Sequence, residues 1–260
     1  MERRRLRARL IVFAGIIGFG FLVGAVLGLV GAGGAIIAVP ALVYILGVPV
    51  SEAMSTSLVM AASSSVAAVV PRLRGGVDWR VAAAVGTAGI PAAFAGTAVN
   101  QILPQQVVLL AFALLMVVAG IQMLRPRPQA QQPPERRPRW VLHAVLVGLG
   151  AGFLTGLLGV GGGFVIVPAL VLMLCLPIGT AIGTSLLITI VNSIAGFLAH
   201  ASSGSINWTT TLAFAIPAFV ASLIAARFAT RITGRALQRT FAVLVLVVAA
   251  ITIVRTALTR

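Results

Sequence analysis

The sequence predicts an all-α polytopic membrane protein built from two tandem homologous repeats, each with a glycine-broken helix. Of its 260 residues, 60% are hydrophobic and 9% are charged, whereas a soluble domain usually carries about 25% charged residues. The mean hydropathy is +1.12. Apolar runs of about 20 residues, each long enough to span a bilayer core of roughly 30 Å, recur along the chain. The polar surface is too small to cover a water-soluble globule, so that class is excluded.

Ten apolar segments are expected to be helical. Two of them, 33–47 and 161–176, reach only roughly 22–24 Å at about 1.5 Å per residue, so we interpret them as half-helices that follow a break. The first segment is no secretory signal, because its apolar stretch runs on from Leu10 to Val50. About eight full crossings remain, at residues 10–31, 51–71, 79–100, 105–124, 140–159, 179–200, 207–230 and 236–257.

A polar linker divides the chain near its middle. The stretch 125–139 reads RPRPQAQQPPERRPR, and its five prolines and several charges exclude a buried helix. The expected organisation is a first transmembrane repeat at 1–124, the linker at 125–139 and a second transmembrane repeat at 140–260.

The two halves resemble each other in register. Residues 28–60 align with 156–188 at an offset of 128, and 16 of the 33 positions are identical. Internal repeats are typical of secondary transporters, which place the substrate site between the repeats. The arginine clusters disagree about orientation under the positive-inside rule, so parallel and inverted repeats both stay open.

Glycine occupies every fourth residue upstream of each break. Such a helix face lets a neighbouring helix approach closely, and we expect the two repeats to dock there. The residues are Gly20, Gly24 and Gly28 in the first repeat and Gly148, Gly152 and Gly156 in the second.

The glycine break is the strongest functional motif. Consecutive glycines unwind an apolar helix at about 1 kcal/mol each relative to alanine, and the freed N–H groups must be buried or line a polar cavity. The helix that restarts points its positive end at that cavity and can bind an anion there. Alternatively, the glycines only permit close packing. The candidate substrate-binding residues are Gly31, Gly33, Gly34 and Pro40, and Gly159, Gly161, Gly162, Gly163 and Pro168.

Hydroxyl and amide side chains follow each break. The repeat pairs Thr56 and Ser57 with Thr184 and Ser185, and these neutral donors suit an oxyanion. We hypothesise that they line one cavity with the breaks. The alternative, that they bond their own helix backbone, stays open. Asn192 is a further candidate, because an amide in mid-span needs a partner.

Ionisable groups are few away from the arginine clusters. Glu52 and His200 are candidates for proton coupling. No metal-ligand spacing and no catalytic set is visible, so neither a cofactor nor an enzyme activity is expected. The formal charge of +15 comes from 19 arginines without lysine, and these mainly flank apolar spans. They indicate topology and lipid contact rather than nucleic acid binding.

The repeated motif resembles the signature of the TauE/SafE sulfite exporter family. It reads GLVGAGGAIIAVPAL in the first copy and GLLGVGGGFVIVPAL in the second, each followed by a proline and a Thr-Ser pair. The resemblance covers nearly the whole chain and implies a bacterial inner-membrane, multi-pass carrier of sulfite, organosulfonates or related small anions. Carried over by position, it points to the glycines and prolines of both breaks. Ala35 stands where the second copy has Gly163.

The expected function is therefore a secondary transporter that exports a small sulfur-containing anion from a site at the repeat interface. One alternative is an anion channel with the same site, and another is a membrane assembly factor. The expected partners are the anionic substrate and the lipid bilayer. A homodimer stays open.

Overall fold

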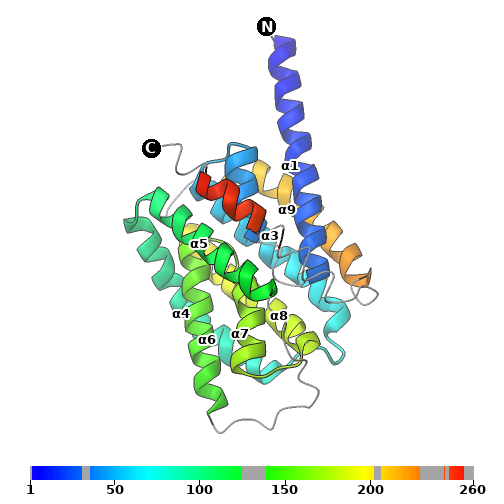
Figure 1. Cartoon of the computed structure of the whole chain (residues 1–260). Coiled ribbons are helices and arrows are strands. Elements are labelled where there is room, and N and C mark those ends of the chain that lie inside the picture. Colours follow the sequence, from blue (N-terminus) through cyan, green and yellow to red (C-terminus); the bar gives the residue numbers. More distant parts are fainter. Residues whose placement is uncertain are drawn as a thin grey trace.

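The computed structural model describes residues 2–30, 36–124, 139–201, 206–228, 243 and 246–254, and every regular element in these ranges is a helix (Figure 1). The predicted all-α class is therefore confirmed for this part of the chain. In order, the helices are α1 (Glu2–Val30), α2 (Ala38–Pro40), the π-type turn η2 (Ala41–Ile45), α3 (Val50–Val69), the 3-10 turn η3 (Val70–Arg72), α4 (Trp79–Ile102), α5 (Gln105–Leu124), α6 (Trp140–Leu158), α7 (Gly163–Met173), α8 (Ile178–Ala201) and α9 (Trp208–Phe228).

Six helices among the described residues are long and apolar enough to cross a membrane. Large apolar side chains such as Leu146, Ile216 and Leu198 are half exposed on them, as expected for surfaces that face lipid. The prediction of about eight crossings is thus met in part: the first predicted segment, 10–31, contributes the shorter apolar helix Gly15–Leu29, and segment 236–257 lies largely outside the described residues. The six spans are Val50–Arg72, Trp79–Ile102, Gln105–Gln122, Trp140–Leu158, Ile178–Ala201 and Trp208–Phe228.

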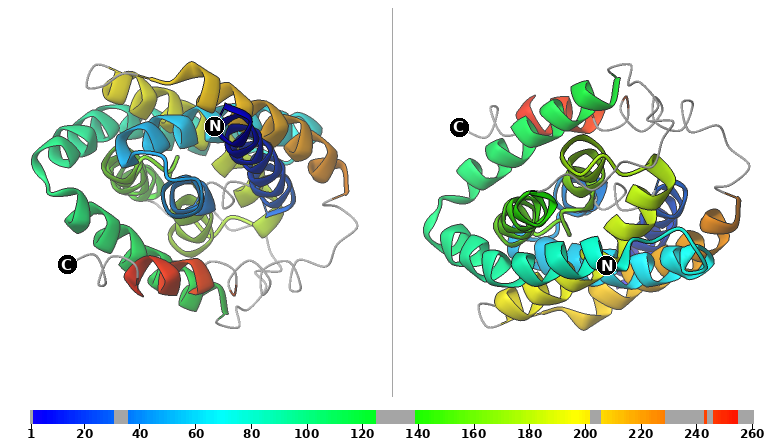
Figure 2. Two further views of the ribbon diagram at one scale, coloured as in Figure 1. Left: turned by 90° about the horizontal axis from the view of Figure 1, so that it is seen from above. Right: turned by 90° about the horizontal axis from the view of Figure 1, so that it is seen from below.

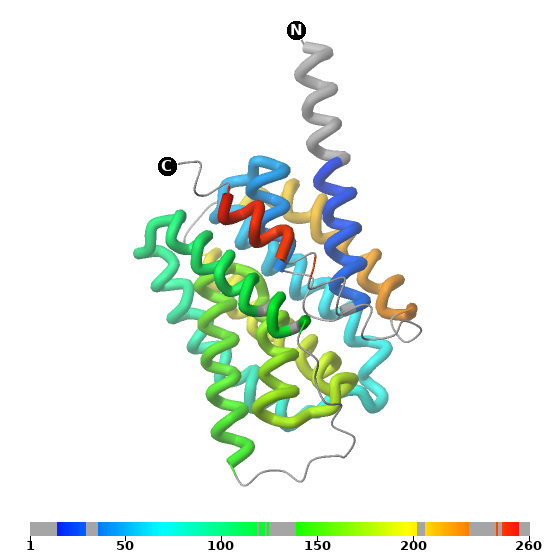
Figure 3. Tube along the Cα trace, in the orientation of Figure 1, coloured from blue at the N-terminus to red at the C-terminus, as the bar shows by residue number. Residues whose placement is uncertain are grey.

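The predicted short helices both occur as short elements inside the helical bundle. Ile166 and Leu170 of α7 pack in one cluster with Ala144 and Val147 from the first half of α6. The chain therefore rises along α6, turns at the glycines and returns along α6 as α7 (Figure 3). The end-on views place α2 with η2, and α7, inside the surrounding helices (Figure 2).

The glycine ladders dock two pairs of parallel helices, which confirms the expected close approach. In α1, Gly20 and Gly24 lie against Phe214 and Ala218 of α9. In α6, Gly148 and Gly152 lie against Val85 and Gly89 of α4. A Cβ placed at any of these four glycines would lie within 2.5 Å of a backbone oxygen. Each pair joins one helix from residues 1–124 to one from residues 140–260.

This docking gives a direct stability prediction. Gly152→Ala is expected to lower the free energy of unfolding by about 2 kcal/mol, because overpacking a tight contact costs roughly that much. The matched control is Gly150→Ala in the same helix, where an added Cβ meets nothing within 4 Å. Thermal unfolding in detergent should show a lower midpoint for the first variant and an unchanged or higher one for the second. Equal midpoints would contradict the docking.

Candidate functional site

The second glycine break is built from three left-handed residues. Gly159 has φ +66°, Gly161 +67° and Gly162 +64°, a region that costs other residues about 1–2 kcal/mol. Gly159 ends α6, and its N–H donates to the Thr155 carbonyl at 2.8 Å. Gly162 precedes α7. These glycines therefore turn the chain through the interior, as the motif predicted.

The start of α7 presents backbone donors. The N–H groups of Val165 and Ile166 both donate to the Gly162 carbonyl, at 3.0 and 3.2 Å. Within the described part of the chain, no N–H from Val160 to Phe164 donates a hydrogen bond. A helix start with unpaired N–H groups carries a partial positive charge and attracts anions.

The predicted hydroxyls of α3 touch the second half of the chain. The Thr56 hydroxyl lies 3.0 Å from that of Thr211 in α9. The Ser57 hydroxyl donates to the Met54 carbonyl at 3.0 Å and also contacts the carbonyl of Gly159. Ser57 and the second break, which are 102 residues apart in sequence, are therefore in direct contact.

The matching pair in α8 is also occupied by protein partners. The Thr184 hydroxyl accepts from the Asp78 N–H at 2.9 Å, and Ser185 donates to the Ile182 carbonyl at 2.8 Å. Asp78 itself caps α4 by accepting from the N–H groups of Arg80 and Val81. In this structure all four predicted hydroxyls thus have protein partners: Thr56, Ser57 and Thr184 contact other parts of the chain, and Ser185 bonds its own helix backbone.

The free polar groups lie further along α3 and α8. Each is buried with no exposed surface and makes no hydrogen bond in the structure. Buried polar groups without a partner are costly and rare, and each one calls for an explanation such as a ligand. The residues are Ser64 and Ser65 in α3 and Thr189, Asn192 and Ser193 in α8.

Sequence reasoning singled out Asn192 among these five residues. Ser64 and Ser65 correspond to Asn192 and Ser193 at the repeat offset of 128. That correspondence is the signal that could have found them.

Two of these residues, Ser193 and Thr189, lie against Gly161 of the break. A Cβ at Gly161 would lie 2.8 Å from the Ser193 Oγ, 2.9 Å from the Ala61 Cβ and 3.4 Å from the Thr189 Cγ2. Ser65 follows Ala61 by one turn of α3. Asn192 packs against α4, where a Cβ at Gly89 would lie 2.9 Å from its Cγ. We call this meeting point the polar junction and define it by Gly161, Gly162, Ser64, Ser65, Thr189, Asn192 and Ser193.

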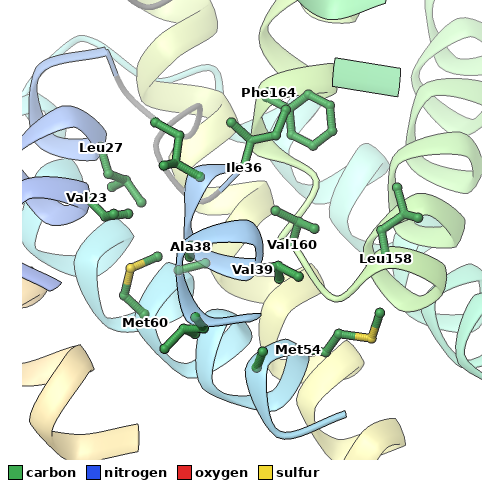
Figure 4. Packing of buried hydrophobic residues seen from close by; sticks show 14 of the residues in the cluster. Val23, Leu27, Ile36, Ala38, Val39, Met54, Met60, Leu158, Val160 and Phe164 are labelled. Carbon is green, nitrogen blue, oxygen red and sulfur yellow. The ribbon is translucent and has the colours of Figure 1, made fainter. Parts of the chain in front are cut away.

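The starts of the two short helices meet at the same place. Ile36 and Val39 share one buried cluster with Val160 and Phe164 (Figure 4). Ile36 and Phe164 are equivalent positions at the repeat offset. The proposed site residues Gly31, Gly33 and Gly34 lie outside the described residues. Pro40 and Pro168 are both buried, in α2 and α7.

A groove of about 330 Å³ runs between α3 and α8. Ser63 and Ser193 are the polar residues that line it, so Ser193 belongs to both the groove and the polar junction. Its other lining residues are Leu58, Val59, Ala62, Val66, Ile190, Ile194 and Phe197.

The two candidates for proton coupling lie in different surroundings. Glu52 sits in the first turn of α3 and is partly exposed. His200 is 8% exposed near the end of α8. No group of three His, Cys, Asp or Glu side chains that could hold a metal occurs among the residues described.

Comparison with known proteins places this architecture in a family. The chain is 34% identical over 239 residues to a probable membrane transporter protein of Xylella fastidiosa (strain Temecula1 / ATCC 700964), covering 90% of this chain and 92% of that one. It is 24% identical over 215 residues to the probable membrane transporter protein YdhB of Bacillus subtilis (strain 168), covering 80% and 86%. No solved structure gives a significant match. The model of the family described as sulfite exporter TauE/SafE matches residues 16–252, and the chain belongs to this family of membrane transporters.

Proposed function

We propose that this chain is a bacterial inner-membrane secondary transporter that exports sulfite, an organosulfonate or a related small sulfur-containing anion, and that the anion binds at the polar junction. One observation carries the proposal. Five buried hydroxyl and amide side chains on α3 and α8 lack hydrogen-bond partners, and two of these residues, Ser193 and Thr189, lie against Gly161 of the break that precedes α7. A bound anion or water molecules would give these groups hydrogen-bond partners, whereas apolar side chains packed against them would not.

The chemistry of the polar junction favours an anion over a cation. Serine, threonine and asparagine side chains donate hydrogen bonds, and the start of α7 adds N–H groups and a partial positive charge. No carboxylate belongs to the junction, so a cation would find no charged ligand. Small oxyanions accept several hydrogen bonds at once, and neutral donors of this kind suit them.

We further propose that the two repeats have inverted orientations. Glycines of α1 dock on α9, and the matching glycines of α6 dock on α4, so equivalent helices make equivalent contacts. In Figure 1, α1 and α6 run in opposite directions, as do α3 and α8. An axis in the membrane plane would then pass between α3 and α8, near the polar junction. This arrangement is common where transporters bind substrate at a repeat interface.

The membrane potential supports export as the working direction. An anion that leaves a cell with a negative interior gains about 2.3 kcal/mol per charge per 100 mV. Export therefore needs no coupling ion, and alternating access at the repeat interface suffices.

Flux in proteoliposomes tests the proposal. Purified protein should move sulfite or a small sulfonate saturably and should discriminate against larger anions. Sulfate serves as a tetrahedral competitor of the same charge class. Single-channel currents instead of saturable flux would indicate the anion channel, and the absence of flux for every small oxyanion would overturn the proposal.

A further inference from the structure

The chain has two histidines, and they lie in different surroundings. Both place Nδ1 at 2.9 Å from a backbone carbonyl four residues earlier, Gly196 for His200 and Arg139 for His143. His143 is partly exposed, whereas His200 is buried. The Nε2 of His200 is also buried and makes no hydrogen bond. The transport site described above does not use this group.

The contacts of His200 assign its tautomer. A carbonyl oxygen only accepts, so Nδ1 must carry the hydrogen that faces Gly196. Nδ1 also lies 3.2 Å from the Thr97 hydroxyl. That hydroxyl donates to the Ala93 carbonyl at 3.0 Å, which leaves its oxygen free to accept from Nδ1. Nε2 is therefore unprotonated and buried, and its lone pair can accept one proton.

The last turn of α6 lies against the residues that neighbour His200. The Thr97 hydroxyl also lies 3.4 Å from the Gly156 carbonyl, and the Asn100 amide donates to the Leu157 carbonyl at 2.6 Å. Both carbonyls belong to the last turn of α6, where the helix end carries a partial negative charge.

No ionisable side chain occurs among these neighbours. The neighbours on α4 and α6, which are Thr97, Asn100, Gly156 and Leu157, are uncharged. On α3, Met54 contacts Asn100, and Glu52 in the first turn is the ionisable residue at that end of the helix. The next residues after α8, 202–205, contain no ionisable side chain.

Thr155 of α6 lies between the break and Gly196, which precedes His200 by one turn of α8. A Cβ at Gly196 would lie 3.4 Å from the Thr155 methyl group, and Gly196 accepts from His200. The Thr155 hydroxyl on the other side touches Gly162, the residue that precedes α7. An anion at the start of α7 would therefore be connected to His200 through Thr155 and the Gly196 turn of α8.

We propose that His200 is a proton-binding site linked to the anion site: Nε2 takes up one proton as the anion binds at the polar junction and releases it as the anion leaves. This inference rests on the proposed function. The proton comes from water on the side where the anion enters and returns to water where it exits. With a doubly charged anion the loaded carrier still moves one net negative charge, so the potential still favours export, whereas with a singly charged sulfonate the loaded carrier is neutral and the potential does not drive its export. By linkage, protonation and anion binding strengthen each other by the same factor.

The test compares two matched variants in proteoliposomes. His200→Asn keeps an N–H donor for Gly196 and removes Nε2, and His143→Asn makes the same change at the partly exposed site. The wild-type apparent affinity for sulfite is expected to rise about tenfold as the pH falls through the range in which histidine titrates. H143N should behave like the wild type, and H200N should transport with an affinity that no longer depends on pH beyond the protonation of sulfite itself. The same measurement with methanesulfonate removes the contribution of substrate protonation, because the sulfonate does not titrate in this range.

A second readout depends neither on transport nor on the folding of H200N. Selective ¹⁵N-histidine labelling gives two imidazole spectra, and H143N assigns them. Adding sulfite to the wild type should move the His200 signals toward the protonated form at fixed pH, and leave those of His143 unchanged. Unchanged His200 signals with intact flux would overturn the proton linkage and leave the transport proposal standing. The absence of flux in the wild type would instead overturn the transport proposal.

Discussion

Replacing Asn192 with leucine is expected to raise the stability of the protein and to abolish its transport. The amide is fully buried and unpaired at both atoms, and an unsatisfied buried polar group costs about 1–3 kcal/mol. Leucine has a similar size and removes that cost, so the unfolding midpoint in detergent should rise. The same change deletes a donor from the polar junction, so sulfite flux should fall at least about 100-fold if the amide bonds the anion directly, a loss of about 2.7 kcal/mol.

Asn100→Leu is the matched control for this variant. Its amide is already paired with the Leu157 carbonyl at 2.6 Å, so leucine would leave that carbonyl without a donor and lower stability by about 1 kcal/mol. Opposite signs of the stability change at the two asparagines would separate a binding amide from a structural one. Wild-type flux in N192L, or a lower midpoint than the wild type, would contradict the assignment of Asn192 to the anion site.

Gly161→Ala is expected to cost both stability and transport. The residue has φ +67°, where a side chain costs about 1–2 kcal/mol. The new methyl group would also meet the Ser193 Oγ and the Ala61 Cβ at 2.8 and 2.9 Å. It would therefore separate the break from α3 and α8 where the anion site lies, and flux should fall by at least about tenfold, or 1.4 kcal/mol.

The chain offers a control with the same backbone strain. Gly47 also has φ +67°, and an added Cβ there meets nothing within 4 Å. Gly47→Ala should lower stability by about 1–2 kcal/mol and leave flux close to the wild type. If the two variants lose flux equally, general destabilisation explains the loss and the break has no special role in transport.

Much of the fold could be predicted from the sequence because the bilayer limits the choices. Apolar runs of sufficient length must be helices, so α3, α4, α8 and α9 were found within a few residues. The short segments were recognised by length, and α7 begins at Gly163 as the break required. The glycine ladders identified the docking faces of α1 and α6. They could not name the partners α9 and α4, because a row of small residues specifies closeness and not which helix approaches.

The site was predicted less completely. The Thr-Ser pairs were conspicuous in the repeat, yet the structure gives Thr56, Ser57, Thr184 and Ser185 protein partners. Whether a hydroxyl in a membrane helix is free depends on the neighbouring helix, and the sequence of one helix does not hold that information. Asn192 was found because an amide in mid-span is conspicuous by itself. The serines of α3 correspond to Asn192 and Ser193 in the repeat, but only their lack of partners in the structure separates them from Thr56 and Ser57.

The most direct test of the central claim is the position of a bound anion. Selenite has the pyramidal shape of sulfite and an anomalous scatterer at its centre, so crystals grown with it would show the anion without ambiguity. We expect one anomalous peak at the start of α7, with its oxygens within about 3.2 Å of the Ser193 or Asn192 side chains. A peak elsewhere in the protein, under conditions that give saturable flux, would contradict the polar junction as the transport site.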